Sequence, residues 1–347
     1  MLEHIRKSRS QGPGRIPRAR TSWILASTLL LAACGSTDQT PAAPSLSPSL
    51  TVTGSVTGAL SGTTLPGVDI VVAGLGATTS AADGSFSLGT AKATGYRVTL
   101  RSPSTIERVT GVKVGVPATV SLIPTSFDIA AFDQMARGNE GALHRWVSAP
   151  RLIVQRRVLA FSTTSAASYV ATGRLLSDQE VASLVADLSS ALPIVSGNTH
   201  AAFAEVTIQS AAEGEAVTVA SQGAVHVARY EGLEASTTFA GYTRWAWNGE
   251  GQLTRAILML DRAYEESTTF GLRLLRTHEF GHAYGYNHAT GRSSFMNAIV
   301  AIEPNAIDRD IARLAFQRPP LNVSPDSDPQ SFSTNRAPAT ETWAGSP

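Results

Sequence analysis

The chain has 347 residues, of which 43% are hydrophobic and 16% charged, so it is long enough for two domains and apolar enough to bury a core. Its formal net charge is +1, and the excess of basic residues is confined to residues 1–33. Without that segment, 22 basic and 26 acidic groups remain, which leaves no general basic excess for binding nucleic acid. Because Cys34 is the single cysteine, the sequence excludes an intramolecular disulfide and a zinc site made of several thiolates.

Residues 1–33 have the pattern of an export signal, in which basic residues precede an apolar stretch at 23–33. That stretch is about half of the ~20 residues that a spanning helix needs, which favours a cleaved signal over a transmembrane helix. The letters "LAAC" that end at Cys34 resemble the lipobox of bacterial lipoproteins. The resemblance implies a lipid anchor on Cys34 and, because Gly35 rather than aspartate follows, the outer membrane. An incidental cysteine is the alternative.

Residues 34–50 are rich in serine, proline and alanine without an apolar period, which is typical of a flexible tether. In residues 51–122, short β-branched runs are separated by glycine, proline and the hairpin signal Asp83-Gly84, and this pattern predicts a small β-sandwich. The run "GSVTG…LPGVDIVVAGLGATTSAADGSFSL" resembles the carboxypeptidase-regulatory-like domain. Since residues 51–122 hold no histidine or cysteine, we expect a spacer or docking module.

A second domain is expected at 146–317, after a linker at 123–145, and it mixes helices with strands. A helix at 176–192 is predicted by its apolar face and by the capping box of Ser177 and Glu180. A second helix is expected to start near Ser267 or Thr268 and to run through the histidine-rich segment. We expect the Pro/Ser/Asp-rich tail at 318–347 to drape over the domain or to leave it. The remaining predicted elements are strands at 151–161, 203–209, 223–230, 241–247 and 254–261, and a helix at 306–316.

Three of the seven histidines lie in "HEFGHAYGYNH", residues 278–288. On a helix His278 and His282 share one face, so their imidazoles can bind one tetrahedral zinc. Glu279 is offset from them and can instead take a proton from a water at the metal. Gly285 can end the helix in the left-handed conformation, after which His288 approaches from another direction. Three protein ligands leave one position open, as in a catalytic zinc site. Histidines with only a structural role on a helix are the alternative.

This segment matches the metzincin motif HExxHxxGxxH in every fixed position, and the chain therefore resembles that family of zinc proteases. Met296 in "SSFMN" resembles the family's Met-turn, although ordinary core packing is the alternative. The short spacing from His288 resembles the matrixin branch, and Ala298 replaces the tyrosine of the astacin and serralysin branches. The prodomain cysteine that keeps some matrixins latent has no counterpart, because Cys34 is the only thiol.

The resemblance implies a multidomain chain in which a small all-β sandwich precedes an α+β metzincin domain. It implies one catalytic zinc per chain held by His278, His282 and His288, with Glu279 as general base. The expected activity is hydrolysis of proteins or peptides outside the cytoplasm by a membrane-anchored lipoprotein. The alternatives are a metzincin-type zinc site that has lost activity and a non-catalytic surface binder that retains only the fold.

Several other residues allow more than one interpretation. The strand at 241–247 would by resemblance be the sheet edge above the cleft, where a peptide can add as a further strand. Trp245 and Trp247 on it are favoured as core residues. Asp326 and Asp328 in "PDSDP" suit either calcium or, as we favour, a solvated turn. Matrixins often hold calcium or a second zinc, but the sequence assigns ligands for neither. Three further histidines have no partner spacing and are expected at the surface or in hydrogen bonds: His144, His200 and His226.

Overall fold

The computed structural model describes residues 50–89, 94–164, 167–267, 271–299, 302–330 and 342–346. The chain divides into Met1–Ser47 and Pro48–Pro347, and the described residues all belong to the second unit. The expected export signal, Cys34 and nearly all of the tether lie outside the described residues. Among the helices of the described part, none is long and apolar enough to cross a membrane.

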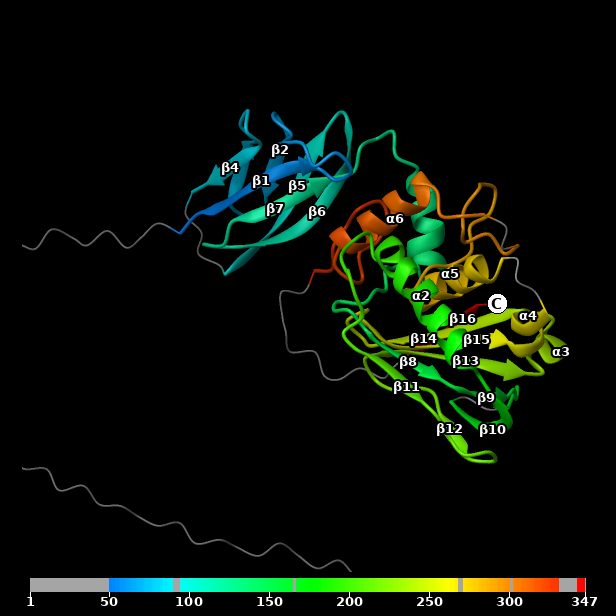
Figure 1. Ribbon diagram of the computed structural model, residues 1–347. Helices are drawn as coiled ribbons and strands as arrows, with labels where there is room; N and C mark the ends of the chain where they lie inside the picture. Colours follow the sequence, from blue (N-terminus) through cyan, green and yellow to red (C-terminus); the bar gives the residue numbers. More distant parts are fainter. Residues whose placement is uncertain are drawn as a thin grey trace, which may run out of the picture. The chain divides into compact units, whose positions relative to one another are not determined.

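Residues 52–122 form two small sheets that share a hydrophobic core (Figure 1). One sheet has the strand order β4-β1-β7 and the other β3-β2-β5-β6. Alternate residues of the strands point inward, so that Val56, Ile70, Val98 and Leu100 are almost fully buried, as the two-residue period of a sandwich strand requires. The strands are Val52–Gly58 (β1), Asp69–Val72 (β2), Gly76–Thr79 (β3), Ser85–Leu88 (β4), Gly95–Ser102 (β5), Thr105–Lys113 (β6) and Ala118–Leu122 (β7).

Residues 123–145, expected to be a linker, are instead part of the core that follows. They form a helical turn, Ile129–Phe132 (α1), then a π-helical turn, Asp133–Arg137, and a 3-10 turn, Gly138–Glu140. Phe132 and Met135 are buried in the same cluster as the sheet and helices of the later part of the chain. The linker prediction is therefore wrong, because tertiary packing decides the burial of this segment.

The later part of the chain is built on one mixed sheet of nine strands among the described residues. The strand order is β12-β10-β9-β13-β15-β14-β16, and β8 pairs with both β13 and β11. The expected strand at 151–161 is two strands, and β10, β12 and β16 were not predicted. The strands are Arg151–Gln155 (β8), Arg157–Ala160 (β9), Ser168–Leu175 (β10), Val206–Gln209 (β11), Ala216–Thr218 (β12), Ala224–Glu231 (β13), Gly241–Trp247 (β14), Leu253–Asp261 (β15) and Thr342–Ser346 (β16).

Helices α2, α5 and α6 pack on one face of this sheet over the larger core cluster (Figure 1). The capping box of α2 is present, because Ser177 and Glu180 each accept from the other's backbone N–H. The opposite face carries a smaller cluster that includes Tyr169, Tyr230 and Met259. The helices are Asp178–Val195 (α2), Leu233–Thr237 (α3), Arg262–Ser267 (α4), Leu272–Ala283 (α5) and Ala306–Gln317 (α6).

A buried charge network fixes helix α5 against its neighbours. Arg276 of α5 forms ion pairs with Glu265 of α4 and, at 2.7 Å, with Asp187 of α2. Arg229 of β13 binds Glu265 from the other side at 3.0 Å. Because removing one member would leave the other charges buried and uncompensated, the network holds α5 to one position.

The segment after α6 is not the draped or dangling tail that the sequence predicted, at least over residues 318–330. Arg318 and Asp326 are fully buried and form a bidentate ion pair with two N···O distances of 2.7 Å. Asp328 accepts from Arg108 at 3.0 Å and from Thr110 at 2.6 Å. A solvated turn is therefore wrong for both aspartates, and their pairing with arginines gives no support to calcium binding.

Candidate metal centre

Helix α5 carries His278 and His282 on one face, and it is followed by a glycine whose backbone is in the left-handed conformation. Gly285 has φ +89°, and an added Cβ would lie 2.7 Å from the carbonyl oxygen of His144, so only glycine fits there. The chain then turns back, and His288 joins the other two histidines. These three residues are the one group of histidine, cysteine or carboxylate side chains in the described chain that is placed to hold a metal ion.

The three Nε2 atoms form a nearly equilateral triangle. The distances are 3.1 Å between His278 and His282, 3.2 Å between His282 and His288, and 3.3 Å between His288 and His278. Ligands on a tetrahedral ion with metal–nitrogen bonds of about 2.0–2.1 Å stand about 3.3 Å apart. The donor set and its spacing therefore fit a metal ion that keeps a fourth position open.

The tautomers of two histidines are fixed by carbonyl groups behind them. Nδ1 of His278 lies 2.8 Å from the Phe295 carbonyl oxygen, and Nδ1 of His282 lies 2.6 Å from that of Tyr286. A carbonyl only accepts, so both Nδ1 atoms carry the proton and both Nε2 atoms present lone pairs. Two lone pairs that face each other at 3.1 Å repel unless a cation lies between them.

Burial keeps the same rings neutral, which is the form that binds metals. It lowers the pKa of His278 to about 4, and it lowers the pKa of His282 well below its ordinary value. The indole of Trp245 on β14 stacks parallel to the His282 ring, with a centroid separation of 5.9 Å. The two faces of the site are thus helix α5 and strand β14.

Glu279 lies against β14 rather than in the histidine triangle. Its side chain is almost fully buried, and Oε2 accepts from Oγ1 of Thr243 at 2.7 Å. A Cβ on Gly241 would lie 2.7 Å from Cγ of Glu279, so this glycine makes the space for the carboxylate. Burial raises the pKa of Glu279 to about 8 despite the hydrogen bond from Thr243. A cation in the histidine triangle would favour the ionised form and lower that pKa.

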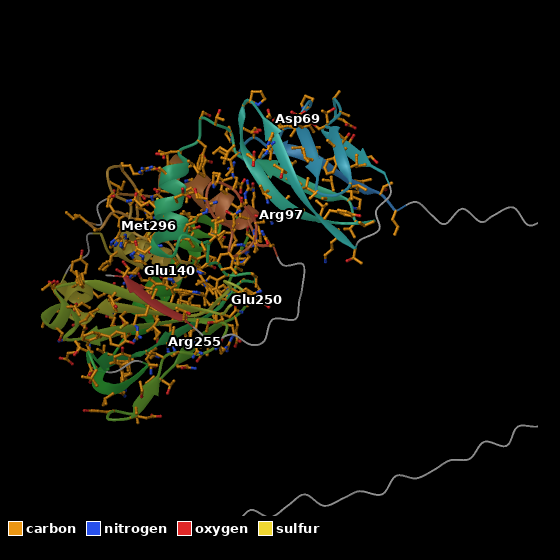
Figure 2. The ribbon with its side chains drawn as sticks, turned by 180° about the vertical axis from the view of Figure 1, so that it is seen from behind. Asp69, Arg97, Glu140, Glu250, Arg255 and Met296 are labelled. Carbon is orange, nitrogen blue, oxygen red and sulfur yellow. The ribbon has the colours of Figure 1, made fainter. Side chains whose placement is uncertain are left out.

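Met296 is fully buried in the larger core, on the helix-covered side of the sheet (Figure 2). It follows the residue whose carbonyl accepts from His278, and its Sδ lies so close to Gly281 of α5 that a Cβ there would overlap it. Gly281 therefore lets the turn around Met296 approach the helix. The roles of Gly241, Thr243 and Gly281 could not be predicted from the sequence, because each depends on a neighbour distant in the chain.

Asp308 of α6 holds the segment that carries the Phe295 carbonyl. Its two oxygens accept from Oγ of Ser294 at 2.5 Å and from the backbone N–H of Phe295 at 3.2 Å. The same carboxylate accepts from the backbone N–H of Asn305, which caps α6. Asp308 thus helps to orient His278 through one intervening residue, Phe295.

Asp308→Asn is expected to weaken metal binding about 10- to 100-fold, because the carboxylate that holds Ser294 and Phe295 behind His278 loses its charge. Competition with a fluorescent zinc chelator measures the change in affinity. Asp310→Asn is the matched control on the same helix, since Asp310 is partly exposed and its nearest ion-pair distance, to Arg313, is 3.9 Å. Equal affinities for the two variants would show that Asp308 does not act on the site.

The other three histidines among the described residues lie outside this site, and none of these three is at the surface. His144 is buried and stacks on Trp247 with a centroid separation of 4.2 Å. Nδ1 of His200 lies 3.1 Å from the Tyr284 hydroxyl, as a hydrogen-bonded histidine requires. His226 is buried on β13, neither of its ring nitrogens has a partner among the described residues, and burial lowers its pKa to about 4. The hydrogen-bonded alternative is confirmed for His200, whereas the surface alternative is wrong for His144 and His226, which are both buried.

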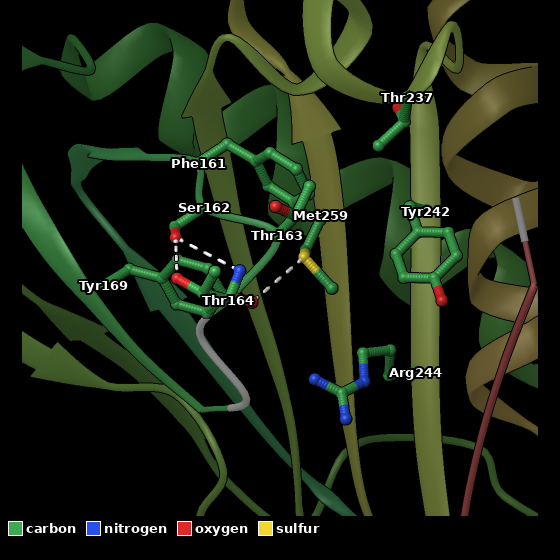
Figure 3. A pocket seen from close by; sticks show the side chains of 9 residues that line it. All are labelled: Phe161, Ser162, Thr163, Thr164, Tyr169, Thr237, Tyr242, Arg244 and Met259. Atoms are coloured by element: carbon green, nitrogen blue, oxygen red, sulfur yellow. Dashed lines mark hydrogen bonds between the residues drawn. The ribbon is translucent and has the colours of Figure 1, made fainter.

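A separate pocket of about 410 Å³ lies on the other face of the sheet, where Tyr242 and Arg244 of β14 line it together with Tyr169 and Met259 (Figure 3). None of the three clustered histidines lines it. Because residues alternate along a strand, Thr243 and Trp245 point to the opposite, helix-covered face. The pocket is therefore distinct from the candidate metal centre.

No protein-family model and no curated protein matches the chain. Among solved structures, the Bacillus anthracis TIE protein is similar at 10% sequence identity with a TM-score of 0.19. The match covers 59% of this chain and 40% of that one, so the chain spans well under half of that protein's length. A TM-score this low establishes neither a shared fold nor a shared function.

Proposed function

We propose that this chain is a zinc-dependent endopeptidase of metzincin type. The observation that carries the proposal is the convergence of three histidine Nε2 atoms at 3.1–3.3 Å, two of them fixed as lone-pair donors by carbonyls behind the rings. Three neutral imidazoles on a tetrahedral site with one open position are the donor set of a catalytic zinc. Residues 146–317 are the proposed catalytic domain, and residues 51–122 a spacer or docking module.

Bound zinc would supply a Lewis acid that polarises the scissile carbonyl and lowers the pKa of water to about 7. Glu279 is the proposed general base, which takes the proton of the attacking water and passes it to the leaving amine. Thr243 orients this carboxylate by donating a hydrogen bond to Oε2. Burial of Glu279 excludes bulk water from it, so that its proton affinity is set by the site.

Two other features support the metzincin type in particular. Met296 lies under the site, packed against Gly281 of the histidine-bearing helix. Gly285 ends that helix with a positive φ, which turns the chain so that His288 can join the cluster. Both residues stand at positions that the resemblance assigned. A non-catalytic surface binder with a relic fold remains the second candidate, and the presence of Glu279 beside a complete set of three histidines argues against it.

The activity is tested with the full chain and denatured casein as substrate. We expect cleavage that 1,10-phenanthroline stops and that added Zn²⁺, but not Mg²⁺, restores. Metal binding without cleavage, together with binding of a protein or glycan by residues 51–122, would instead favour the non-catalytic binder.

The proposed location is an outer-membrane lipid anchor at Cys34, and it is supported by the sequence "LAAC" after a basic and apolar segment. Incorporation of labelled palmitate that depends on Cys34 tests this part separately, since the metal centre does not require it. An unlabelled chain would remove the anchor from the proposal and leave the peptidase unaffected.

A further inference from the structure

Strand β14 has a second neighbour that comes from far along the chain. Residues Thr342–Ser346 pair with it antiparallel as β16, on the side away from β15 (Figure 1). The register places Ser346 opposite Thr243 and Ala344 opposite Trp245. Without β16, β14 would be an edge strand with one row of backbone groups open to a further strand.

Two of the β14 residues that pair with β16 contact residues of the candidate metal centre. Thr243 donates to Glu279, and Trp245 stacks on His282. A small cavity of about 100 Å³ is lined by Ala344 and Gly345 together with Gly285 and Asn287, which belong to the loop that brings in His288. Strand β16 therefore runs along the border of the site.

An exposed sheet edge binds extended peptides by adding them as a strand, in which backbone hydrogen bonds give affinity and side-chain pockets give specificity. We infer that Thr342–Ser346 is an intramolecular occupant of the peptide-binding edge of β14, and that it competes there with substrate peptides. This inference rests on the proposed function. A substrate must displace the segment before its backbone can pair with β14.

The side chains of β16 fit against strand β14. Ala344 is partly buried against the larger core cluster, beside the strand position of Trp245. Gly345 lies against the other face of β14, where an added Cβ would be 2.6 Å from the Tyr242 hydroxyl oxygen and 3.2 Å from Cγ of Arg244. A side chain at the Gly345 position would therefore have to displace the Tyr242 hydroxyl and the Arg244 stem. A tethered segment acts at an effective concentration of about the millimolar range, so even a weakly held strand excludes substrates of lower affinity.

The first test measures hydrogen exchange of the β14 backbone amides in the zinc-loaded full chain. Gly345→Val and a chain that ends at Glu341 are each expected to raise exchange of the outward-facing β14 amides at least tenfold, because β16 no longer protects them. Thr342→Ala is the matched control, since Thr342 is exposed and the change leaves the strand intact. Unchanged zinc content shows that the variants are folded. Equal exchange in all four chains would overturn the inference.

The second test measures competition. Gly345→Val is expected to lower KM for an unrelated fluorogenic peptide about tenfold, whereas kcat stays the same because the catalytic groups are untouched. A synthetic peptide with the sequence of residues 340–346 should inhibit this variant competitively. Unchanged KM in a variant whose β14 exchange has risen would overturn the competition. If no chain cleaves peptides but exchange still rises in both variants, the proposed peptidase fails, whereas occupancy of the edge stands.

Discussion

Replacing Glu279 by glutamine is expected to lower kcat/KM for peptide hydrolysis about 10²- to 10⁴-fold, while the metal stays bound. Glutamine keeps the shape of the side chain and can still accept from Thr243, but it cannot take a proton from water. The three histidines are untouched, so the zinc content should remain that of the parent chain. Steady-state hydrolysis of a fluorogenic peptide, with zinc content measured on the same samples, gives both quantities.

The matched control for this variant is Glu250→Gln. Glu250 is an exposed glutamate in the turn between β14 and β15, and Figure 2 labels it. The Glu250→Gln variant should cleave the peptide at the parent rate, since Glu250 contacts neither Glu279 nor the histidines. If the Glu279→Gln chain cleaved as fast as this control, Glu279 could not be the general base and another group would have to be sought.

The second large effect is expected from removing one metal ligand. His282→Ala should weaken zinc binding roughly 100- to 1,000-fold. The free energy of zinc binding in proteins is about 10–16 kcal/mol, and division over the four ligands of a tetrahedral site gives about 2.5–4 kcal/mol for each ligand. His282 also lies between the other two histidines and Trp245, so no nearby side chain can replace it. Competition titration with a zinc indicator measures the affinity.

His226→Gln serves as the control for histidine loss in general. His226 lies on β13 with its neighbours Ala228 and Tyr230 on the sheet face opposite the site. Its replacement should leave the zinc affinity unchanged. Equal losses in the two variants would mean that the loss reflects unfolding rather than ligation, and the three-histidine centre would then lack support.

Local sequence signals predicted the parts of the site that depend on local geometry. The spacing of His278 and His282 fixes their common helix face, and Gly285 supplies the positive φ that ends the helix. The same holds for α2, where Ser177 and Glu180 cap the helix as their spacing predicted. Each of these features depends only on residues within one or two helical turns of each other.

The parts that the sequence did not predict depend on contacts between distant segments. Thr243 reaches Glu279 only because β14 lies beside α5, and no residue next to Thr243 indicates this. Asp326 and Asp328 resembled a solvated turn because the arginines that neutralise them, Arg318 and Arg108, are separated from the PDSDP motif in sequence. The five residues of β16 show no apolar alternation, and their strand exists through pairing with a segment about 100 residues earlier.

The most direct test of the central claim is the zinc content of the purified full chain by elemental analysis, before and after dialysis against a chelator. The geometry of His278, His282 and His288 predicts about one zinc per chain, which the chelator removes and added Zn²⁺ restores. A chain that binds no zinc when it is supplied in excess would contradict the metal centre, and with it the proposed peptidase.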